Sequence, residues 1–204
     1  MRSLLRQLGY RTYGWKLGSN LGPTPKIVDG LEQRFRSIVE RNDQPVSIVG
    51  WSLGGIYGRQ LARHNPDQVR QVVTLGSPFR MRPGDRSAAS PIWDSLSRVH
   101  DQEALAAMIA PDRPPLTVPT TSIYTRSDGI VRWSMCLESV GEQSENVEVL
   151  GSHCGLGFNP QVAMVVADRL ATGPNDWRPF RPPSWAKSAF PPPADWEPGR
   201  CPAA

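Results

Sequence analysis

The pentapeptide Gly50-Trp51-Ser52-Leu53-Gly54 constrains the fold of this 204-residue chain more than any other segment. It follows an apolar run at residues 46–49 and precedes a helical pattern at residues 56–63. Gly-x-Ser-x-Gly between a strand and a helix predicts a sharp turn, the nucleophile elbow, that holds a serine hydroxyl clear of the sheet. Strand end and helix start nearly touch in such a turn. We therefore expect Gly50, Gly54 and Gly55 to be required for their small size.

The rest of the chain alternates helical and strand patterns. Helices are expected at residues 2–8, from Pro25 onward behind a Thr24 cap, at 54–64, at 101–110 and from Pro160 onward behind an Asn159 cap. Strands are expected at residues 10–17, 46–49, 69–75, 116–125 and 146–150. Alternating strands and helices predict an α/β fold, with a mainly parallel sheet that carries helices on both faces.

Two segments depart from this alternation. Residues 79–115 lack a strand pattern and are predicted to be a lid or cap insertion within a domain of residues 1–172; an ordinary packed cap is an equally good interpretation. Residues 173–204 contain nine prolines and three tryptophans, a composition that excludes long helices and inner strands. We predict a partly disordered tail, with disorder beyond about Pro182.

Composition excludes several classes of function. The net charge is +4, and the basic residues, twenty arginines and three lysines, are scattered along the chain, so a nucleic-acid surface is disfavoured. The three cysteines form no CxxC pair, so a zinc knuckle or a thioredoxin-type site is not supported. Neither a metal nor a cofactor is expected, and whether Cys136 and Cys154 are bridged stays open. No apolar run is long enough to span a bilayer, and the first residues do not resemble a signal peptide. A cytoplasmic location is expected, and the oligomeric state stays open.

Ser52, Asp128 and His153 each follow a predicted strand, in that order along the chain. Because the carboxyl ends of parallel strands meet at one edge of a sheet, we expect these side chains to lie together there. A serine hydroxyl needs a base to become nucleophilic, which His153 would supply, and Asp128 would orient the imidazole. His64 lies about three turns down the helix after Ser52, and His100 lies in the insertion, so both are poorer bases.

Four segments together resemble the α/β-hydrolase superfamily, and within it bacterial esterases and triacylglycerol lipases. They are residues 46–55, 73–78, 127–131 and 151–156, and the resemblance covers roughly residues 1–172. It implies Ser52 as nucleophile, Asp128 as orienting acid and His153 as base. The backbone N–H of Leu53 would be one oxyanion donor. Members of the superfamily carry a further strand and an oxyanion loop before the first helix. The chain here begins inside what resembles that helix, so we expect an N-terminally truncated fold with no evident second donor.

The sequence therefore predicts a serine hydrolase that cleaves small-molecule or lipid carboxylic esters. Its substrate is expected to contact Trp51, and also Trp93, Leu105 and Met108 of the insertion. Two alternatives remain: acyl transfer or thioester hydrolysis on the same triad, and a weakly active or non-catalytic remnant that serves as a binding module. A Rossmann-type cofactor site is disfavoured because the glycines after residue 49 do not fit G-x-G-x-x-G.

Overall fold

The computed structural model describes residues 1–20, 22–82, 85–88, 90–109, 113–139, 141–173 and 175–193. Four strands form its sheet: β1 (Val46–Trp51), β2 (Val69–Leu75), β3 (Thr120–Tyr124) and β4 (Ser144–Glu148). They lie in the order β1-β2-β3-β4, and each neighbouring pair is parallel. Within the described chain, β1 and β4 are therefore the two edge strands.

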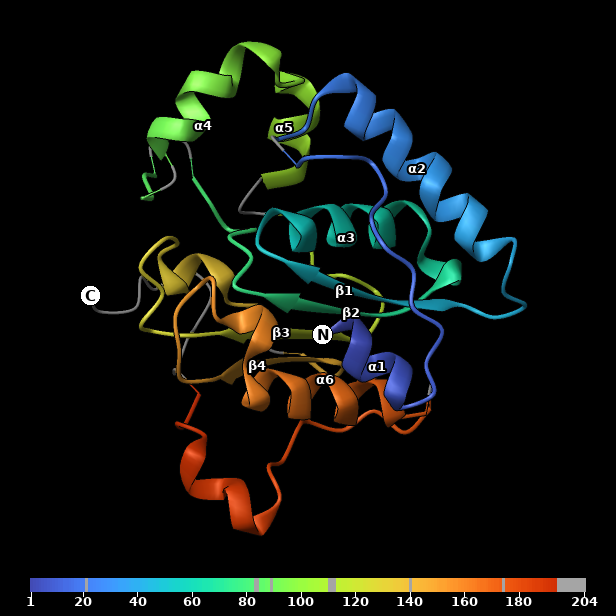
Figure 1. Ribbon diagram of the computed structural model, residues 1–204, viewed down its shortest axis with the longest axis vertical. Coiled ribbons are helices and arrows are strands. Elements are labelled where there is room, and N and C mark those ends of the chain that lie inside the picture. Colours follow the sequence, from blue (N-terminus) through green and yellow to red (C-terminus); the bar gives the residue numbers. More distant parts are fainter. Residues whose placement is uncertain are drawn as a thin grey trace.

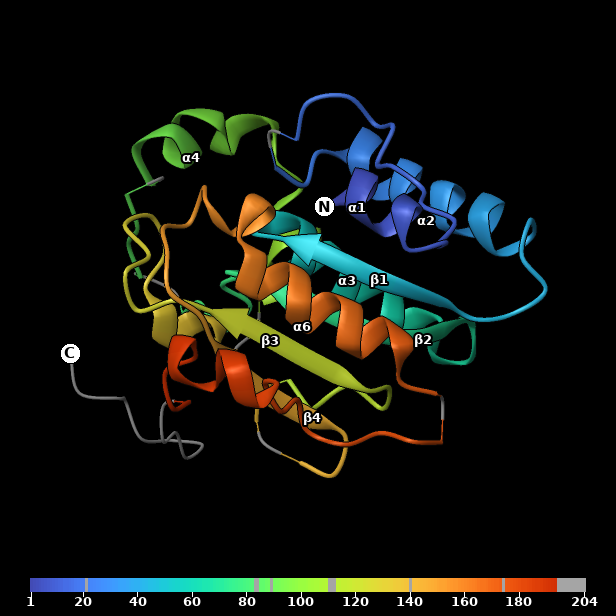
Figure 2. The same cartoon turned by 60° about the horizontal axis from the view of Figure 1, so that its bottom comes forward.

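Helices cover both faces of this sheet (Figure 1). On one face lie α2 (Pro25–Val39), α3 (Leu53–His64) and α5 (Gln102–Ile109); on the other lie α1 (Arg2–Gln7) and α6 (Pro160–Ala171). In the turned view of Figure 2, α6 lies across the sheet, and α1 and α2 lie near β1. The predicted α/β fold with a parallel sheet is confirmed. No helix among the described residues combines the length and the apolar character needed to cross a membrane.

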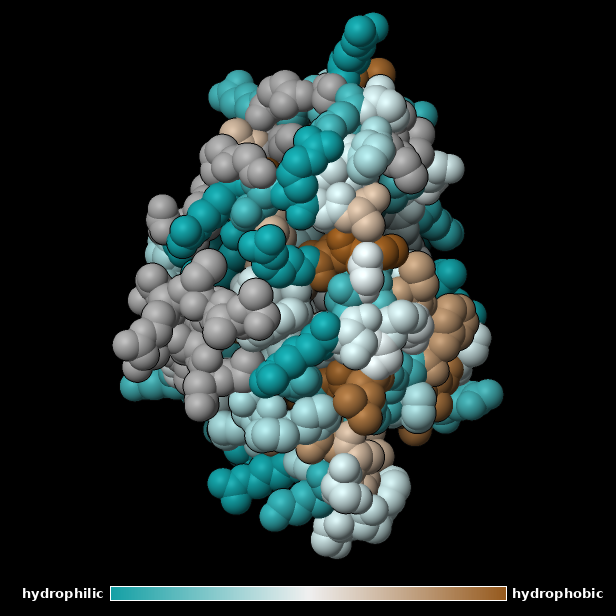
Figure 3. All heavy atoms as spheres, turned by 90° about the vertical axis from the view of Figure 1, so that its left-hand side faces the viewer, coloured by the Kyte–Doolittle hydropathy of each residue, from teal (hydrophilic) through white to brown (hydrophobic). Residues whose placement is uncertain are grey.

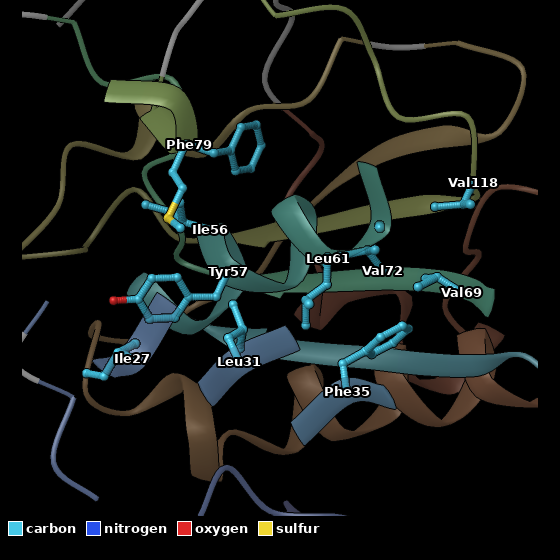
Figure 4. Packing of buried hydrophobic residues seen from close by; sticks show 12 residues of the cluster. Ile27, Leu31, Phe35, Ile56, Tyr57, Leu61, Val69, Val72, Phe79 and Val118 are labelled. Atoms are coloured by element: carbon cyan, nitrogen blue, oxygen red, sulfur yellow. The ribbon is translucent and has the colours of Figure 1, made fainter. Parts of the chain in front are cut away.

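The sheet separates two apolar cores because side chains alternate along each strand. Val72 and Val73 of β2 are both fully buried, and they belong to different clusters. Val72 joins the cluster that α2, α3 and α5 contribute to, which Figure 4 shows packed between the helices and the sheet. Val73 joins the cluster that α1 and α6 contribute to. Burying one such aliphatic side chain contributes about 1.5–3 kcal/mol.

Two helices begin where the sequence predicts. The Thr24 hydroxyl accepts a hydrogen bond from the Ile27 amide at 3.4 Å, and Asn159 Oδ1 accepts one from the Gln161 amide at 2.8 Å. A proline follows each cap, at a position where the missing N–H costs no helical bond. The caps of α2 and α6 could therefore be identified from sequence alone.

The strand predicted at residues 10–17 is wrong. Aromatic and polar residues do alternate there, but the segment pairs with no strand of the described sheet. Lys16 has φ 57° and Gly18 φ 81°, left-handed conformations that end any extended run. Trp15 packs on a helix instead, and its ring stacks on Tyr57 of α3 with ring centroids 5.5 Å apart. Alternation alone did not distinguish this segment from a strand.

The described residues of the predicted insertion, 79–115, form two α-helices, of which only α5 was predicted. The other is α4 (Ser90–Leu96), which continues into the short 3₁₀ turn Ser97–Val99. Helix α5 packs on α3, and its Met108 is 8% exposed within the core cluster of that face. This packing favours the ordinary cap for the α5 part of the insertion.

The tail was predicted to be disordered beyond Pro182, and over residues 183–193 the structure contradicts this. A 3₁₀ helix spans Ser184–Ala189, and Phe180 and Phe190 pack against the core beneath α6. The Phe180 amide donates to the Glu145 carboxylate of β4 at 2.6 Å. Aromatic residues between the prolines therefore dock the segment without requiring regular secondary structure. Residues 194–204 lie outside the described part of the chain.

Docking of the tail can be tested at two alanines of the same 3₁₀ helix. Ala186 is 5% exposed, whereas Ala189 is exposed. We expect Ala186→Glu to bury an unpaired carboxylate and to lower the free energy of unfolding by about 1–3 kcal/mol, with faster proteolysis at residues 178–190. The control Ala189→Glu should change neither quantity measurably. Equal urea midpoints and cleavage rates for the two variants would show that the segment is not docked.

Candidate active site

The turn between β1 and α3 holds Ser52 in a conformation that non-glycine residues rarely adopt. Its φ is 51° and its ψ −125°, between the last residue of β1 and the first of α3. Such a backbone costs about 1–3 kcal/mol and persists only where neighbouring contacts fix it. Two hydrogen bonds do so here: the Ser52 amide donates to the Leu75 carbonyl at 2.8 Å, and the Gly55 amide donates to the Ser52 carbonyl at 3.0 Å. The serine is therefore fixed at the carboxyl edge of the sheet.

Two glycines allow the strand and the helix to approach this closely. A Cβ at Gly50 would lie 2.5 Å from both the Gly54 carbonyl oxygen and the Gly55 Cα, and a Cβ at Gly55 would lie 2.0 Å from Ser77 Oγ. A Cβ at Gly54 would have no heavy atom within 4 Å beyond its own neighbours and helix backbone. The requirement for small residues is thus met at Gly50 and Gly55; the expectation that Gly54 is also sterically required is wrong.

Asp128 lies in the turn that follows β3, with its side chain only 2% exposed. Its Oδ1 accepts hydrogen bonds from the amides of Ile130 at 2.9 Å and Val131 at 2.8 Å, and its Oδ2 lies 2.6 Å from Nδ1 of His153. Burial by itself raises the pKa of Asp128. The bonds from His153, Val131 and Ile130 outweigh burial and hold the pKa below its ordinary value. Asp128 is therefore a stable carboxylate at neutral pH.

His153 lies in the loop after β4 and is 4% exposed. Because the ionised Asp128 can only accept, Nδ1 of His153 donates, which leaves Nε2 as the basic nitrogen of the neutral ring. The indole N–H of Trp51 donates to the His153 carbonyl at 3.1 Å, and the two rings lie 5.8 Å apart. The residue before the serine thus positions the loop that carries the histidine.

Gly76, which sequence reasoning did not single out for the site, makes room for the Asp128–His153 pair. It follows β2 directly and has φ 54°. A Cβ there would lie 3.2 Å from Nδ1 of His153 and 3.3 Å from Oδ2 of Asp128. The only sequence signal for its role in the site was that a glycine directly follows β2, the strand beside β1.

Ser52, Asp128 and His153 each follow the carboxyl end of a strand at the same edge of the sheet, and the side chains of Asp128 and His153 are in contact there. No hydrogen bond among the described residues joins the Ser52 hydroxyl to His153, so this link of the triad stays a prediction. Figure 3 faces the edge toward which the strands of Figure 1 point; hydrophilic side chains there surround smaller apolar patches. Trp51, Leu150 and Phe158, from segments at this edge, are 45%, 57% and 90% exposed.

The other predicted substrate contacts have different outcomes. Met108 lies in the core cluster beside α3, and the side chains of Trp93 and Leu105 lie outside the described part of the structure.

Cys136 and Cys154 are both free thiols; burial and then the charge of Asp128 raise the pKa of Cys136. Among the described residues, no cluster of three or more His, Cys, Asp or Glu side chains could hold a metal ion.

Comparison with solved structures identifies the fold of the chain. A crystal structure of a PytH variant matches with a TM-score of 0.54 at 20% identity, covering 82% of this chain and 89% of that one. A second matching structure names PytH a pyrethroid hydrolase. A mouse α/β hydrolase domain-containing protein matches with a TM-score of 0.47 at 14% identity, covering 69% and 70%. A thioesterase domain from the curacin biosynthetic pathway matches at 0.45 and 17% identity, also covering 69% and 70%. No family model and no curated protein matches the sequence. The chain thus has the α/β-hydrolase fold.

The elbow glycines provide a matched pair of substitutions. Gly50→Ala places a methyl group against backbone atoms that cannot move independently, so we expect a loss of about 1–3 kcal/mol in the free energy of unfolding. Gly54→Ala meets open space on a helix and should be neutral or stabilising by up to about 1 kcal/mol. Urea denaturation of both variants measures the difference. Equal destabilisation by the two changes would contradict the described approach of β1 to α3.

The lowered pKa of Asp128 predicts how stability depends on pH. Because its pKa lies lower in the folded than in the unfolded chain, the carboxylate stabilises the fold at neutral pH, and this contribution is lost as pH falls below about 4. We expect the stability difference between the natural chain and Asp128→Asn to shrink as pH falls below about 4. Asp43→Asn, at an exposed aspartate outside the site, controls for the loss of one charge. A difference that does not change down to pH 3 would be evidence against the Asp128 network.

Proposed function

We propose that the protein is a serine hydrolase that cleaves carboxylic esters through an acyl-enzyme on Ser52, His153 and Asp128. The observation that carries the proposal is the 2.6 Å bond between Asp128 and His153. It lies at the sheet edge where the elbow holds Ser52 at φ 51°. An orienting acid, a base and a strained serine supply the three roles that acyl transfer requires. The hydrolase names among proteins of the same fold agree with this class of reaction.

The proposed reaction uses these three groups in turn. Ser52 Oγ attacks the ester carbonyl carbon while Nε2 of His153 takes the hydroxyl proton, and Asp128 stabilises the imidazolium that forms. The tetrahedral intermediate collapses, and His153 gives the proton to the departing alcohol. His153 then takes a proton from water, whose oxygen attacks the acyl carbon; collapse returns the proton to Ser52 and releases the acid.

The N-terminus of α3 would stabilise the oxyanion of both tetrahedral intermediates. Leu53 is the first residue of α3, and the first amides of a helix have no partner inside the helix. Its N–H is the one donor that the proposal assigns. Because removing one such donor costs about 3–4 kcal/mol in other serine hydrolases, a site with a single donor would be slow.

The substrate class follows from the surroundings of His153. Trp51 is 45% exposed and lies beside the histidine ring, which offers an apolar surface to an acyl or alcohol group. We propose a small-molecule or lipid ester, for which an esterase or lipase is the matching enzyme. The cytoplasmic location expected from the sequence stays a prediction.

The edge position of β1 favours a second candidate, a weakly active or non-catalytic binding module. The strand that carries the elbow has one paired neighbour among the described strands, and only one oxyanion donor is assigned. Single-turnover assays distinguish the candidates, since a binding module would release no alcohol. Parallel assays with an oxygen ester, the matching thioester and an added acceptor alcohol separate ester hydrolysis from thioesterase and acyltransferase activity.

Covalent labelling tests the central assignment. We expect a fluorophosphonate to modify Ser52. The Ser52→Ala variant should form no adduct, and any esterase rate should fall by a factor of at least about 10³. Ser127→Ala, at an exposed serine beside Asp128, should leave labelling and turnover unchanged. Intact-mass spectrometry with peptide mapping locates the adduct. If the folded protein carries no adduct, or carries it on another serine, the proposed mechanism is wrong.

A further inference from the structure

Thr125 contacts both loops that carry the Asp128–His153 pair. It directly follows β3 and is 1% exposed. Its hydroxyl donates to the Gly151 carbonyl at 2.8 Å and accepts from the Ser127 amide at 3.2 Å. Its carbonyl accepts from the Asp128 amide at 3.3 Å. One buried side chain thus joins the loop after β3, which holds Asp128, to the loop after β4, which holds His153.

The hydroxyl bond of Thr125 lies just beyond the backbone ladder between β3 and β4. The last pair of the ladder is Tyr124 with Glu148, and the Val149 amide donates to the Tyr124 carbonyl at 2.9 Å. Past this bond both strands have ended, so side chains are needed to hold the two loops at a fixed distance. The Thr125 hydroxyl supplies the next cross-link toward the buried pair.

The residue that accepts this bond lies at a turn of the chain toward His153. Gly151 has φ 140°, a conformation that glycine adopts far more readily than other residues. A Cβ there would lie 3.0 Å from Nδ2 of Asn159. The carbonyl held by Thr125 follows this turn and lies two residues before His153. Because glycine has more conformational freedom than other residues, the bond fixes the direction in which the loop continues.

An ion pair also joins the two segments, but it lies closer to solvent. Nε of Arg126 lies 3.0 Å from Oε2 of Glu148, and the Arg126 side chain is 52% exposed. Water screens such a pair, and it constrains geometry weakly. The bond from Thr125 is buried, and its donor and acceptor would both lose a partner if the loops moved apart. The hydroxyl therefore sets the distance between the loops more strictly than the ion pair does.

We propose that Thr125 is a positioning residue for His153: its hydroxyl holds the loop after β4 where the imidazole can bond to Asp128. That bond tolerates little displacement, because Nδ1 and Oδ2 are 2.6 Å apart and the two side chains are 5% and 2% exposed. The consequence for catalysis rests on the proposed serine-hydrolase function, since a misdirected imidazole would take the proton of Ser52 less often.

The test removes the hydroxyl and keeps the shape of the side chain. A proton shared between an imidazole and a carboxylate resonates far downfield in proton NMR, and we expect Thr125→Val to lose this resonance of His153. The control Thr120→Val makes the same change at the opposite end of β3. There a threonine that is 2% exposed donates to the Val118 carbonyl at 3.0 Å. The control removes an equally buried hydroxyl and should leave the resonance in place, so a merely structural role would not distinguish the two variants.

Ester turnover by the same variants provides the second measurement. Thr125→Val should lower kcat roughly 10–100-fold with KM unchanged, because it misplaces the base without touching the substrate. Thr125→Ser keeps the hydroxyl and should restore both the rate and the resonance. Circular dichroism melting shows whether each variant folds. If Thr125→Val does not fold, Thr125→Cys, whose thiol is a weaker donor, should give an intermediate rate and a weakened resonance.

Three results would overturn the proposal: an unchanged resonance in the folded Thr125→Val or Thr125→Cys variant, an equal change in Thr120→Val, or a natural chain without the resonance. An unchanged kcat in an active protein would overturn the catalytic consequence. The resonance does not require turnover. A natural chain that shows it but hydrolyses no ester would therefore contradict the proposed function alone, and its loss in Thr125→Val would still support the role of Thr125.

Discussion

The close approach of β1 to α3 at Gly50 and Gly55 is the contact on which the rest of the structure depends. No side chain fits between the two backbones, so the chain turns within one residue and places Ser52 at φ 51°. The turn also fixes the direction of α3, which then packs Ile56, Tyr57 and other side chains against the sheet. One steric constraint thus determines both the position of the serine and the packing of this face of the core.

The second organising feature is the parallel sheet, which brings loops distant in sequence to one edge. Asp128 follows β3 and His153 follows β4, 25 positions further along the chain, yet their side chains share a hydrogen bond. The pair is almost wholly buried, where an unsatisfied carboxylate would be costly. Two amides and the imidazole satisfy Asp128, and Gly76 leaves the space that the pair occupies. Backbone groups, which composition does not reveal, therefore contribute as much to this site as the side chains that the sequence identifies.

Local signals predicted the parts of the fold that depend on local physics. The caps at Thr24 and Asn159 and the turn at Ser52 each depend on a few adjacent residues, and their positions were predictable. The segment at residues 10–17 was not, because a strand needs a neighbour, and alternation of side chains does not show whether one is present. The prediction of disorder in the tail was wrong over residues 183–193 for a related reason. Its prolines exclude helix and sheet pairing, but they do not prevent Phe180 and Phe190 from docking.

The arginines show most clearly what a linear sequence conceals. In α6, the buried Arg169 pairs with its neighbour Asp168 and with Glu145, and the pair with Glu145 ties α6 to β4. In α3, the buried Arg59 pairs with Glu138 and lies over the ring of Phe79. Both groups come from the same evenly spread set of arginines, and the net charge of +4 distinguishes neither. In each case a cation that is taken out of water is stabilised by a carboxylate that folding brings to it from another segment of the chain, so only the fold shows which charges are paired.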